Sequence, residues 1–193
     1  MTDVIIVGGG PAGLSAALFT AKNGLSTTVF DTDETWMHKA HLWNYLGIES
    51  EDGTAFTETS REQVDEFGAD RRQGEKVSEV SRNGEGFVVT TDEDEYEAPY
   101  VVLATGADRS LAEGLGCEST EDGVVDVDVT TETSVPNAYA TGAMVRAEEW
   151  QAVISAGDGA AAALNILTKE KGEHFHDFDV PGDADALFGG DGG

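Results

Sequence analysis

The chain has 193 residues, which is enough for one domain with a hydrophobic core and short for two. Its 38 Asp and Glu residues outnumber its 11 Lys and Arg residues and give a formal net charge of -27. A field of this sign repels nucleic acid and anionic membranes, so neither is expected as a partner. The single cysteine, Cys117, excludes an intrachain disulfide framework, a CxxC redox pair and a cysteine zinc site.

The acidic residues are scattered over the whole chain, and lysine is scarce. This pattern indicates adaptation to high salt, where counterions screen the self-repulsion; the alternative is an acidic surface for a basic partner. The opening "MTDVIIVGGG" is typical of a strand and not of a signal peptide, and no segment approaches 18 consecutive apolar residues. We therefore expect a soluble, cytoplasmic protein.

The chain opens with the pattern of a βαβ unit. Residues 4–7 are a continuous apolar run, typical of a strand buried on both faces. Residues 14–24 have helical spacing of their apolar side chains and end at Asn23-Gly24, and residues 25–31 predict a second strand that ends in Asp31. Together they have the length of one such unit, about 30 residues.

The middle of the chain predicts further strands and one helix. Residues 32–53 show no regular period, and residues 59–69 are expected to form a helix. Residues 85–106 predict two strands around an acidic turn, followed by a buried strand at Tyr100–Leu103.

The last third completes the predicted domain. Residues 124–142 predict one or two strands, and residues 151–172 predict a helix rich in small residues. Residues 173–193 are acidic and Gly-rich and are expected to form a loosely held tail. We predict an α/β fold for residues 1–172: a Rossmann-like domain whose parallel sheet has helices on both faces and a small antiparallel β-layer around residues 80–100.

Gly8, Gly10 and Gly13 form a G-x-G-x-x-G motif between the first strand and the first helix. In this position the first glycine permits a tight turn, the second lets the backbone approach a pyrophosphate, and the third lets the helix pack on the strand. The phosphates would lie at the positive end of the helix. Asp31 ends the next strand, where a carboxylate can accept hydrogen bonds from ribose hydroxyls. The combination predicts a dinucleotide site, whereas the glycines alone would also fit an ordinary turn.

Five segments of the chain carry further information, in the order "DVIIVGGGPAGLSAAL" (3–18), "NYLG" (44–47), "VVLATGA" (101–107), "TSVPNAYATGAM" (133–144) and "QAVISAGDGAAAAL" (151–164). Together they resemble the FAD domain of the thioredoxin reductase-like flavoprotein family. The second segment is similar to the family's Asn-Tyr-Pro-Gly loop, the third to its ATG strand end, and the fourth to its TSVPGIFAAGDV segment. The resemblance covers residues 3 to about 170 and implies FAD rather than NAD as the cofactor.

The resemblance also implies how FAD is held. The helix that begins near Gln151 would direct its N-terminus at the flavin pyrimidine ring, where it favours the negative charge of a reduced flavin. The alternative for this segment is a small-residue helix used for close packing alone. The residues expected to contact FAD are Gly8, Gly10, Pro11, Ala12, Gly13, Asp31, Asn44, Val77, Thr105, Gly106, Ala107, Gly142, Ala143, Gln151 and Ala152.

One whole domain of the family pattern is missing. Only 25 residues, 108–132, separate the ATG segment from the TSVP segment, where family members carry a nicotinamide-binding domain. Because a single βαβ unit already needs about 30 residues, we expect that domain and its redox CxxC to be absent. Cys117 lies in this short connection and is expected to be a bystander.

The flavin-facing segments also depart from the family pattern. Ala143 replaces an Asp that holds the ribityl chain, which removes a charge-assisted hydrogen bond of about 1.5–3 kcal/mol. "DETW" (33–36) replaces a Gly-Gly-Gln stretch, Leu46 replaces the loop's proline, and Trp150 stands where some relatives have Arg. Either the flavin is held differently, against one of the tryptophans Trp36, Trp43 and Trp150, or it is bound weakly, or another ADP-containing ligand is used.

Two groups of residues that contain histidine are candidate metal ligands. His38 and His41 are three residues apart, and His174, His176 and Asp177 lie together in the tail. Neither group has enough further ligands in its neighbourhood, so no metal site is expected.

The sequence as a whole predicts an FAD-dependent oxidoreductase, similar to the flavin domain of thioredoxin reductase, with no identifiable catalytic acid or base. Its electrons would come from a separate reductase or from free NAD(P)H and pass to an acceptor that the sequence does not name. The alternative is a non-catalytic flavin- or nucleotide-binding module, such as a sensor or a subunit. Strand edges left open by the missing domain favour a homodimer.

Overall fold

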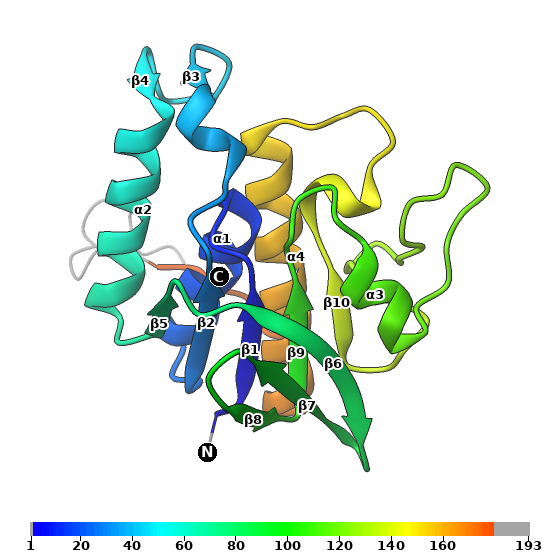
Figure 1. Ribbon diagram of the computed structural model, residues 1–193. Helices are drawn as coiled ribbons and strands as arrows, with labels where there is room; N and C mark the ends of the chain where they lie inside the picture. Colours follow the sequence, from blue (N-terminus) through cyan, green and yellow to red (C-terminus); the bar gives the residue numbers. More distant parts are fainter. Residues whose placement is uncertain (1, 180–193) are drawn as a thin grey trace, which may run out of the picture.

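A computed structural model describes residues 2–179 of the chain (Figure 1). Its centre is a sheet of five parallel strands in the order β10-β9-β1-β2-β5, which confirms the predicted α/β fold. The strands are β1 (Val4–Val7), β2 (Thr27–Asp31), β5 (Asp70–Gln73), β9 (Tyr100–Leu103) and β10 (Ala138–Ala140).

The register of the sheet brings distant segments to one edge. Val7 at the end of β1 pairs with Phe30 of β2 and with Leu103 of β9, and Leu103 in turn pairs with Ala140 of β10. Because parallel strands end at the same edge, the turns that follow all four strands lie side by side there.

Three long helices cover one face of the sheet. They are α1 (Pro11–Lys22), α2 (Gly53–Glu66) and α4 (Ala152–Lys171). Along β1 the side chains alternate, so that Val4 and Ile6 pack under these helices while Ile5 and Val7 face the other way. Both faces of β1 are therefore buried, as its continuous apolar run predicts.

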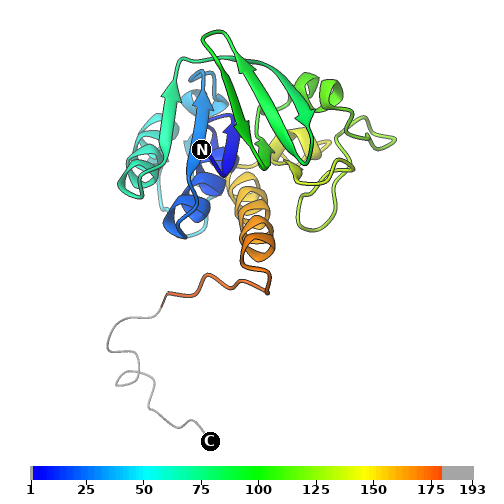
Figure 2. The same cartoon turned by 90° about the horizontal axis from the view of Figure 1, so that it is seen from below.

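The opposite face carries the predicted antiparallel layer (Figure 2). Its strands are β6 (Val77–Asn83), β7 (Gly86–Thr91) and β8 (Glu95–Ala98), and α3 (Ser110–Leu115) packs beside them. Within residues 2–179 this face therefore has one helix, the short α3, whereas all the long helices lie on the first face. None of the helices in this part of the chain is long and apolar enough to cross a membrane.

Short elements frame the end of the molecule where the parallel strands finish. A 3-10 turn, η1 (Trp36–Lys39), leads into the two-stranded pair β3 (His41–Leu42) and β4 (Glu51–Asp52), and a second 3-10 turn, η2 (Gly142–Val145), follows β10. The segment of residues 32–53, expected to be irregular, thus contains three short elements.

Some element boundaries differ from those predicted. The helix expected over residues 59–69 is α2, which begins at Gly53 because Asp52 caps it by accepting from the N–H groups of Thr54 and Ala55. Residues 124–142 contain one named strand, β10, joined to the preceding loops by isolated bridges.

The predicted tail begins at residue 173, after α4 ends with Gly172 in the left-handed conformation. Residues 173–179 have no helix or strand. Lys22 of α1 pairs with Asp177 at 2.9 Å and fixes this segment to the body of the domain. The remainder of the tail, residues 180–193, lies outside the described residues.

Candidate functional site

A cavity of about 730 Å³ runs along the edge at which the parallel strands end. A second cavity of about 540 Å³ adjoins it and shares five lining residues with it: Trp36, Met37, Trp150, Gln151 and Ala152. Asn44 lines the second cavity, whereas Gly13 and Asp31 line neither. Twelve of the residues predicted to contact FAD line the larger cavity: Gly8, Gly10, Pro11, Ala12, Val77, Thr105, Gly106, Ala107, Gly142, Ala143, Gln151 and Ala152.

The glycine turn after β1 needs its glycines for distinct reasons. Gly8 has a φ of 117°, and a Cβ there would lie 2.2 Å from the carbonyl oxygen of Ala104. A Cβ on Gly13 would lie 1.9 Å from the carbonyl oxygen of Gly8, so this glycine lets α1 pack on the turn. A Cβ on Gly10 would meet only the hydroxyl of Thr35, at 3.4 Å, because Gly10 faces the cavity. Packing therefore requires glycine at positions 8 and 13, whereas at position 10 the glycine leaves the cavity open, and its contact with a pyrophosphate stays a prediction.

Two of the three long helices, α1 and α4, begin at the cavity without side-chain caps. Gly10 precedes α1 and Gln151 precedes α4, and neither side chain caps its helix. By contrast, Asp52 caps α2, which begins away from the larger cavity. The first-turn N–H groups of α1 and α4 therefore remain available to a ligand, and the positive ends of both helix dipoles are directed at the same space. Such a site favours a ligand with two negatively charged or acceptor groups.

Asp31 lies beneath the glycine turn instead of in the cavity wall. Its side chain is only 4% exposed, and a Cβ on Gly9 would lie 2.0 Å from its carboxylate. The N–H of Asp33 donates to one Asp31 oxygen at 2.8 Å, and Arg61 of α2 donates to the other at 2.6 Å. The predicted contact between Asp31 and a ribose stays a prediction, and the structure adds that this carboxylate already holds α2 to the turn.

Arg61 also pairs with Asp33, whose other partner is His38. The Arg61 guanidinium, followed by His38, holds the pKa of the Asp33 carboxyl below its usual range. His38 also contacts the Thr54 hydroxyl, whereas His41 contacts Ser50. The two histidines thus have separate partners, and the described residues contain no group of three or more metal-ligating side chains.

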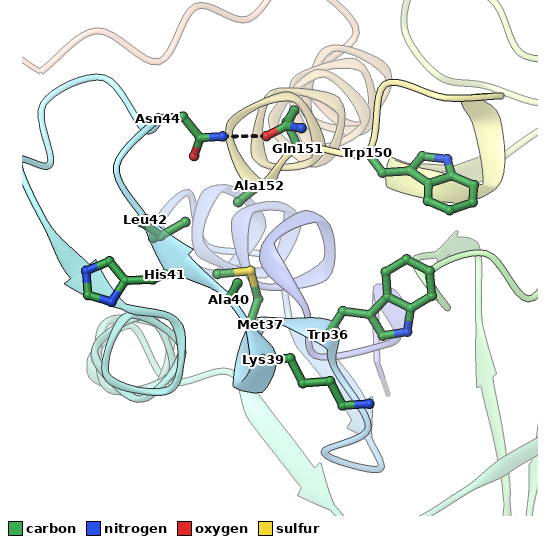
Figure 3. A pocket seen from close by; sticks show the side chains of 10 residues that line it. All are labelled: Trp36, Met37, Lys39, Ala40, His41, Leu42, Asn44, Trp150, Gln151 and Ala152. Carbon is green, nitrogen blue, oxygen red and sulfur yellow. Dashed lines mark hydrogen bonds between the residues drawn. The ribbon is translucent and has the colours of Figure 1, made fainter.

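The start of α4 is fixed on both sides. The Asn44 side chain donates to the side chain of Gln151 at 2.7 Å, which ties the 44–47 loop to the helix (Figure 3). Arg146 pairs with the buried Asp158 at 2.6 Å, and its carbonyl oxygen accepts from the indole N–H of Trp150 at 2.9 Å. The loop between η2 and α4 is therefore anchored to α4 itself.

The other end of the larger cavity is made by residues that the sequence analysis missed. Glu75 is buried there and accepts from the hydroxyl of Thr91 at 2.7 Å. Lys76 and Asp108 also line this end, and the N–H of Ser110 holds the pKa of Asp108 below its usual range. No motif indicates these residues, because their position depends on how β6 and α3 fold back over the sheet.

Cys117 lies away from both cavities. It is half-buried against the core and donates weakly to Thr133 at 3.5 Å. Burial raises the pKa of its thiol, which disfavours the reactive thiolate.

The chain is similar to known proteins both in sequence and in fold. It matches the family described as "Pyridine nucleotide-disulphide oxidoreductase" over residues 2–70 and 46–159. It is 33% identical over 124 residues to a thioredoxin reductase of Peptoclostridium acidaminophilum, which covers 62% of this chain and 38% of that protein. It is 36% identical over 109 residues to a thioredoxin reductase of Bacillus subtilis, covering 55% and 34% respectively. The matched region is thus little more than a third of these relatives.

Solved structures of thioredoxin reductases have a similar fold. A thioredoxin reductase structure from Gloeobacter violaceus superimposes with a TM-score of 0.83 at 22% identity, covering 93% of this chain and 98% of the other. The predicted resemblance to the flavin domain of thioredoxin reductases is confirmed.

Proposed function

The chain belongs to the pyridine nucleotide-disulphide oxidoreductase family, and on this premise we propose that it binds FAD and acts as an oxidoreductase through it. The observation that carries the proposal is the convergence of two uncapped helix N-termini, those of α1 and α4, on one cavity. FAD has an anionic pyrophosphate near its middle and a ring that becomes negatively charged on reduction, so it matches both helix ends.

The turn Gly8–Gly10 and the start of α1 would hold the pyrophosphate. Gly10 leaves space for close approach, and Pro11 at the first helical position leaves the following N–H groups of Ala12 and Gly13 free to donate. Val77 and Lys76 line the same cavity on the side of the antiparallel layer, where the adenosine would lie. Lys76 offers a positive charge to an anionic ligand in a strongly acidic chain.

Gln151 and Ala152 at the start of α4 would hold the ring, with Asn44 beside them. When bound, FAD supplies hydride and electron transfer, and the protein positions the ring and stabilises its reduced form. Ala143 lines the larger cavity without a carboxylate, so the ribityl chain would have fewer charged partners than in the family pattern.

The electron donor would be a separate molecule, either free NAD(P)H or a reductase. Residues 108–132, which stand where the family's nicotinamide domain is inserted, form only α3 and irregular loops. Cys117, the only cysteine, is half-buried away from the cavities and offers no disulfide chemistry. The acceptor is not identified, and a homodimer through the sheet edges stays a prediction.

The test begins with the purified chain. We expect flavin absorption bands at about 370 and 450 nm, release of FAD on denaturation, and re-binding of added FAD to the apoprotein. Steady oxidation of NAD(P)H with a dye acceptor would support the enzyme, whereas FAD binding without turnover would favour a non-catalytic flavin module. A chain that neither carries nor takes up FAD would overturn the proposal.

A matched pair of variants makes the test specific to the site. Gly10→Ala adds a methyl group that the free protein tolerates but that occupies the space for the pyrophosphate. We expect FAD affinity to fall by about tenfold or more, with the melting temperature of the free protein unchanged. Gly114→Ala in α3 adds the same methyl group where no atom lies within 4 Å and should bind FAD normally.

A further inference from the structure

Two tryptophans stand where the two cavities meet. Trp36 begins η1 and Trp150 precedes α4, and both line both cavities. Their ring centroids are 5.5 Å apart, with an angle of 65° between the planes, so they form an edge-to-face pair. Figure 3 shows the two indoles approaching each other from separate elements, while His41 points away on the opposite side of the cavity.

The two rings are held to different degrees. Trp150 is fixed by its hydrogen bond to the Arg146 carbonyl, and Arg146 is fixed by its ion pair with Asp158. Trp36 is placed by its backbone: the hydroxyl of Thr35 accepts from the N–H of Met37, and Met37 is buried. The Trp36 ring itself contacts Trp150 and otherwise faces the cavities.

Both rings remain unusually open to solvent for residues of this size. Trp36 is 62% exposed and Trp150 is 40% exposed within the described part of the chain. Tryptophan has a large apolar surface and stacks favourably on planar rings in an offset or edge-to-face arrangement. A planar ligand entering between Gln151, Ala152 and the two indoles would cover this surface.

We propose that Trp36 and Trp150 form the stacking site for the isoalloxazine ring, an inference that rests on the proposed function. The ring lies at the junction of the cavities, with Gln151 and Ala152 at its polar edge and the indoles against its apolar surface. This stacking compensates for the missing carboxylate at Ala143, because the ring contributes affinity that the ribityl chain does not. Trp36 and Trp150 thus bind the cofactor ring directly.

Trp43 provides the matched control. It is 73% exposed, lines neither cavity and packs on His41 with ring centroids 4.3 Å apart. It is therefore a surface tryptophan of the same region that the proposal leaves out. The three are the only tryptophans of the chain, so tryptophan fluorescence can be assigned by substitution.

The experiment is a titration of the apoprotein with FAD and, separately, with ADP, followed by tryptophan fluorescence and by calorimetry. FAD should quench most of the emission from Trp36 and Trp150, and ADP, which has no flavin ring, should leave it nearly unchanged. Trp36→Ala and Trp150→Ala should each weaken FAD binding about two- to tenfold while ADP affinity stays the same. Trp36→Phe should restore most of the affinity, and Trp43→Ala should behave like the unmodified chain.

The two proposals fail in different ways. If the unmodified chain binds FAD and the Trp36→Ala and Trp150→Ala variants bind it equally well, the stacking site is refuted and the proposed function stands. Equal losses of FAD and ADP affinity in these variants would also refute stacking, because the tryptophans would then act on the whole site. If the unmodified chain binds ADP but not FAD, the proposed function and the stacking site are both overturned.

Discussion

The crossing of α1 and α4 sets the distance between the two helix N-termini of the site, and Gly159 controls that crossing. A Cβ on Gly159 would lie 2.0 Å from the carbonyl oxygen of Ala12 and 3.1 Å from the N of Ala16. A Cβ essentially never comes closer than 3.0 Å to a non-bonded heavy atom outside its own residue and the two adjoining residues. Gly159→Ala therefore forces the two helices apart by about an ångström, against backbone that cannot rotate away.

The same substitution at two glycines of α4, Gly159 and Gly157, should change the free energy of unfolding in opposite directions. Overpacking of a buried contact costs about 1–3 kcal/mol, and a clash with backbone lies at the upper end, so we expect Gly159→Ala to lower the free energy of unfolding by about 3 kcal/mol. Gly157→Ala lies in the same helix with no atom within 4 Å of the added methyl group. Since alanine forms helix better than glycine, this variant should be more stable by about 0.5–1 kcal/mol.

Thermal unfolding of the apoprotein measures both effects. For a domain of this size the expected shifts are a decrease of about 6–12 °C for Gly159→Ala and an increase of about 1–4 °C for Gly157→Ala. FAD affinity should also fall in Gly159→Ala, because separating the helices moves the two N-termini relative to each other. Equal melting temperatures for the two variants would refute the argument that this crossing is set by the missing Cβ.

Three further predictions follow from charge. Ala143→Asp should raise FAD affinity about tenfold or more by calorimetry, because it restores a charge-assisted hydrogen bond, whereas Ala147→Asp on the exposed loop adds the same charge and should have no effect. The melting temperature should rise between dilute and molar KCl as salt screens the net charge of -27, and an unchanged value would contradict adaptation to high salt. Because Arg61 and His38 lower the pKa of Asp33 in the folded state, the stability from this cluster is present above pH 3.8 and is lost as the pH falls through the lowered value. Asp33→Asn should therefore lose less stability in acid than the unmodified chain, as denaturant midpoints from about pH 6 to about pH 3 would show.

The sequence predicts the elements whose pattern is local. The strand β1 and the helix α1 follow from an apolar run, three glycines and a helical period, all within 20 consecutive residues. The strand β6 is missed because its register shifts between Val77 and Glu79, so that Val77 and Val80 are both buried although they are three residues apart. The strand β5 is missed because it lies at the edge of the sheet and contains only polar residues.

The start of α2 at Gly53, earlier than predicted, depends on tertiary packing that the local sequence does not reveal. Gly53 at the first helical position lowers the predicted helix propensity, and the following threonines do the same. In the structure a Cβ on Gly53 would lie 2.0 Å from the carbonyl oxygen of Met37, so η1 requires glycine there. The glycine that weakens the local signal is therefore needed for packing against a segment 16 residues earlier.

The candidate site likewise has a part that the sequence predicts and a part that it does not. Its predictable part is made of backbone: a Cβ on Gly8 or Gly13 would lie about 2 Å from a carbonyl oxygen, so these positions require glycine. The part that sequence reasoning could not place is made of side chains from different elements, such as Arg61 on Asp31 or Trp36 on Trp150, whose meeting depends on loop paths. The affinity for the cofactor and the choice of electron partner are therefore expected to depend on these side chains, and the capacity to hold a dinucleotide on the glycines and the two helix N-termini.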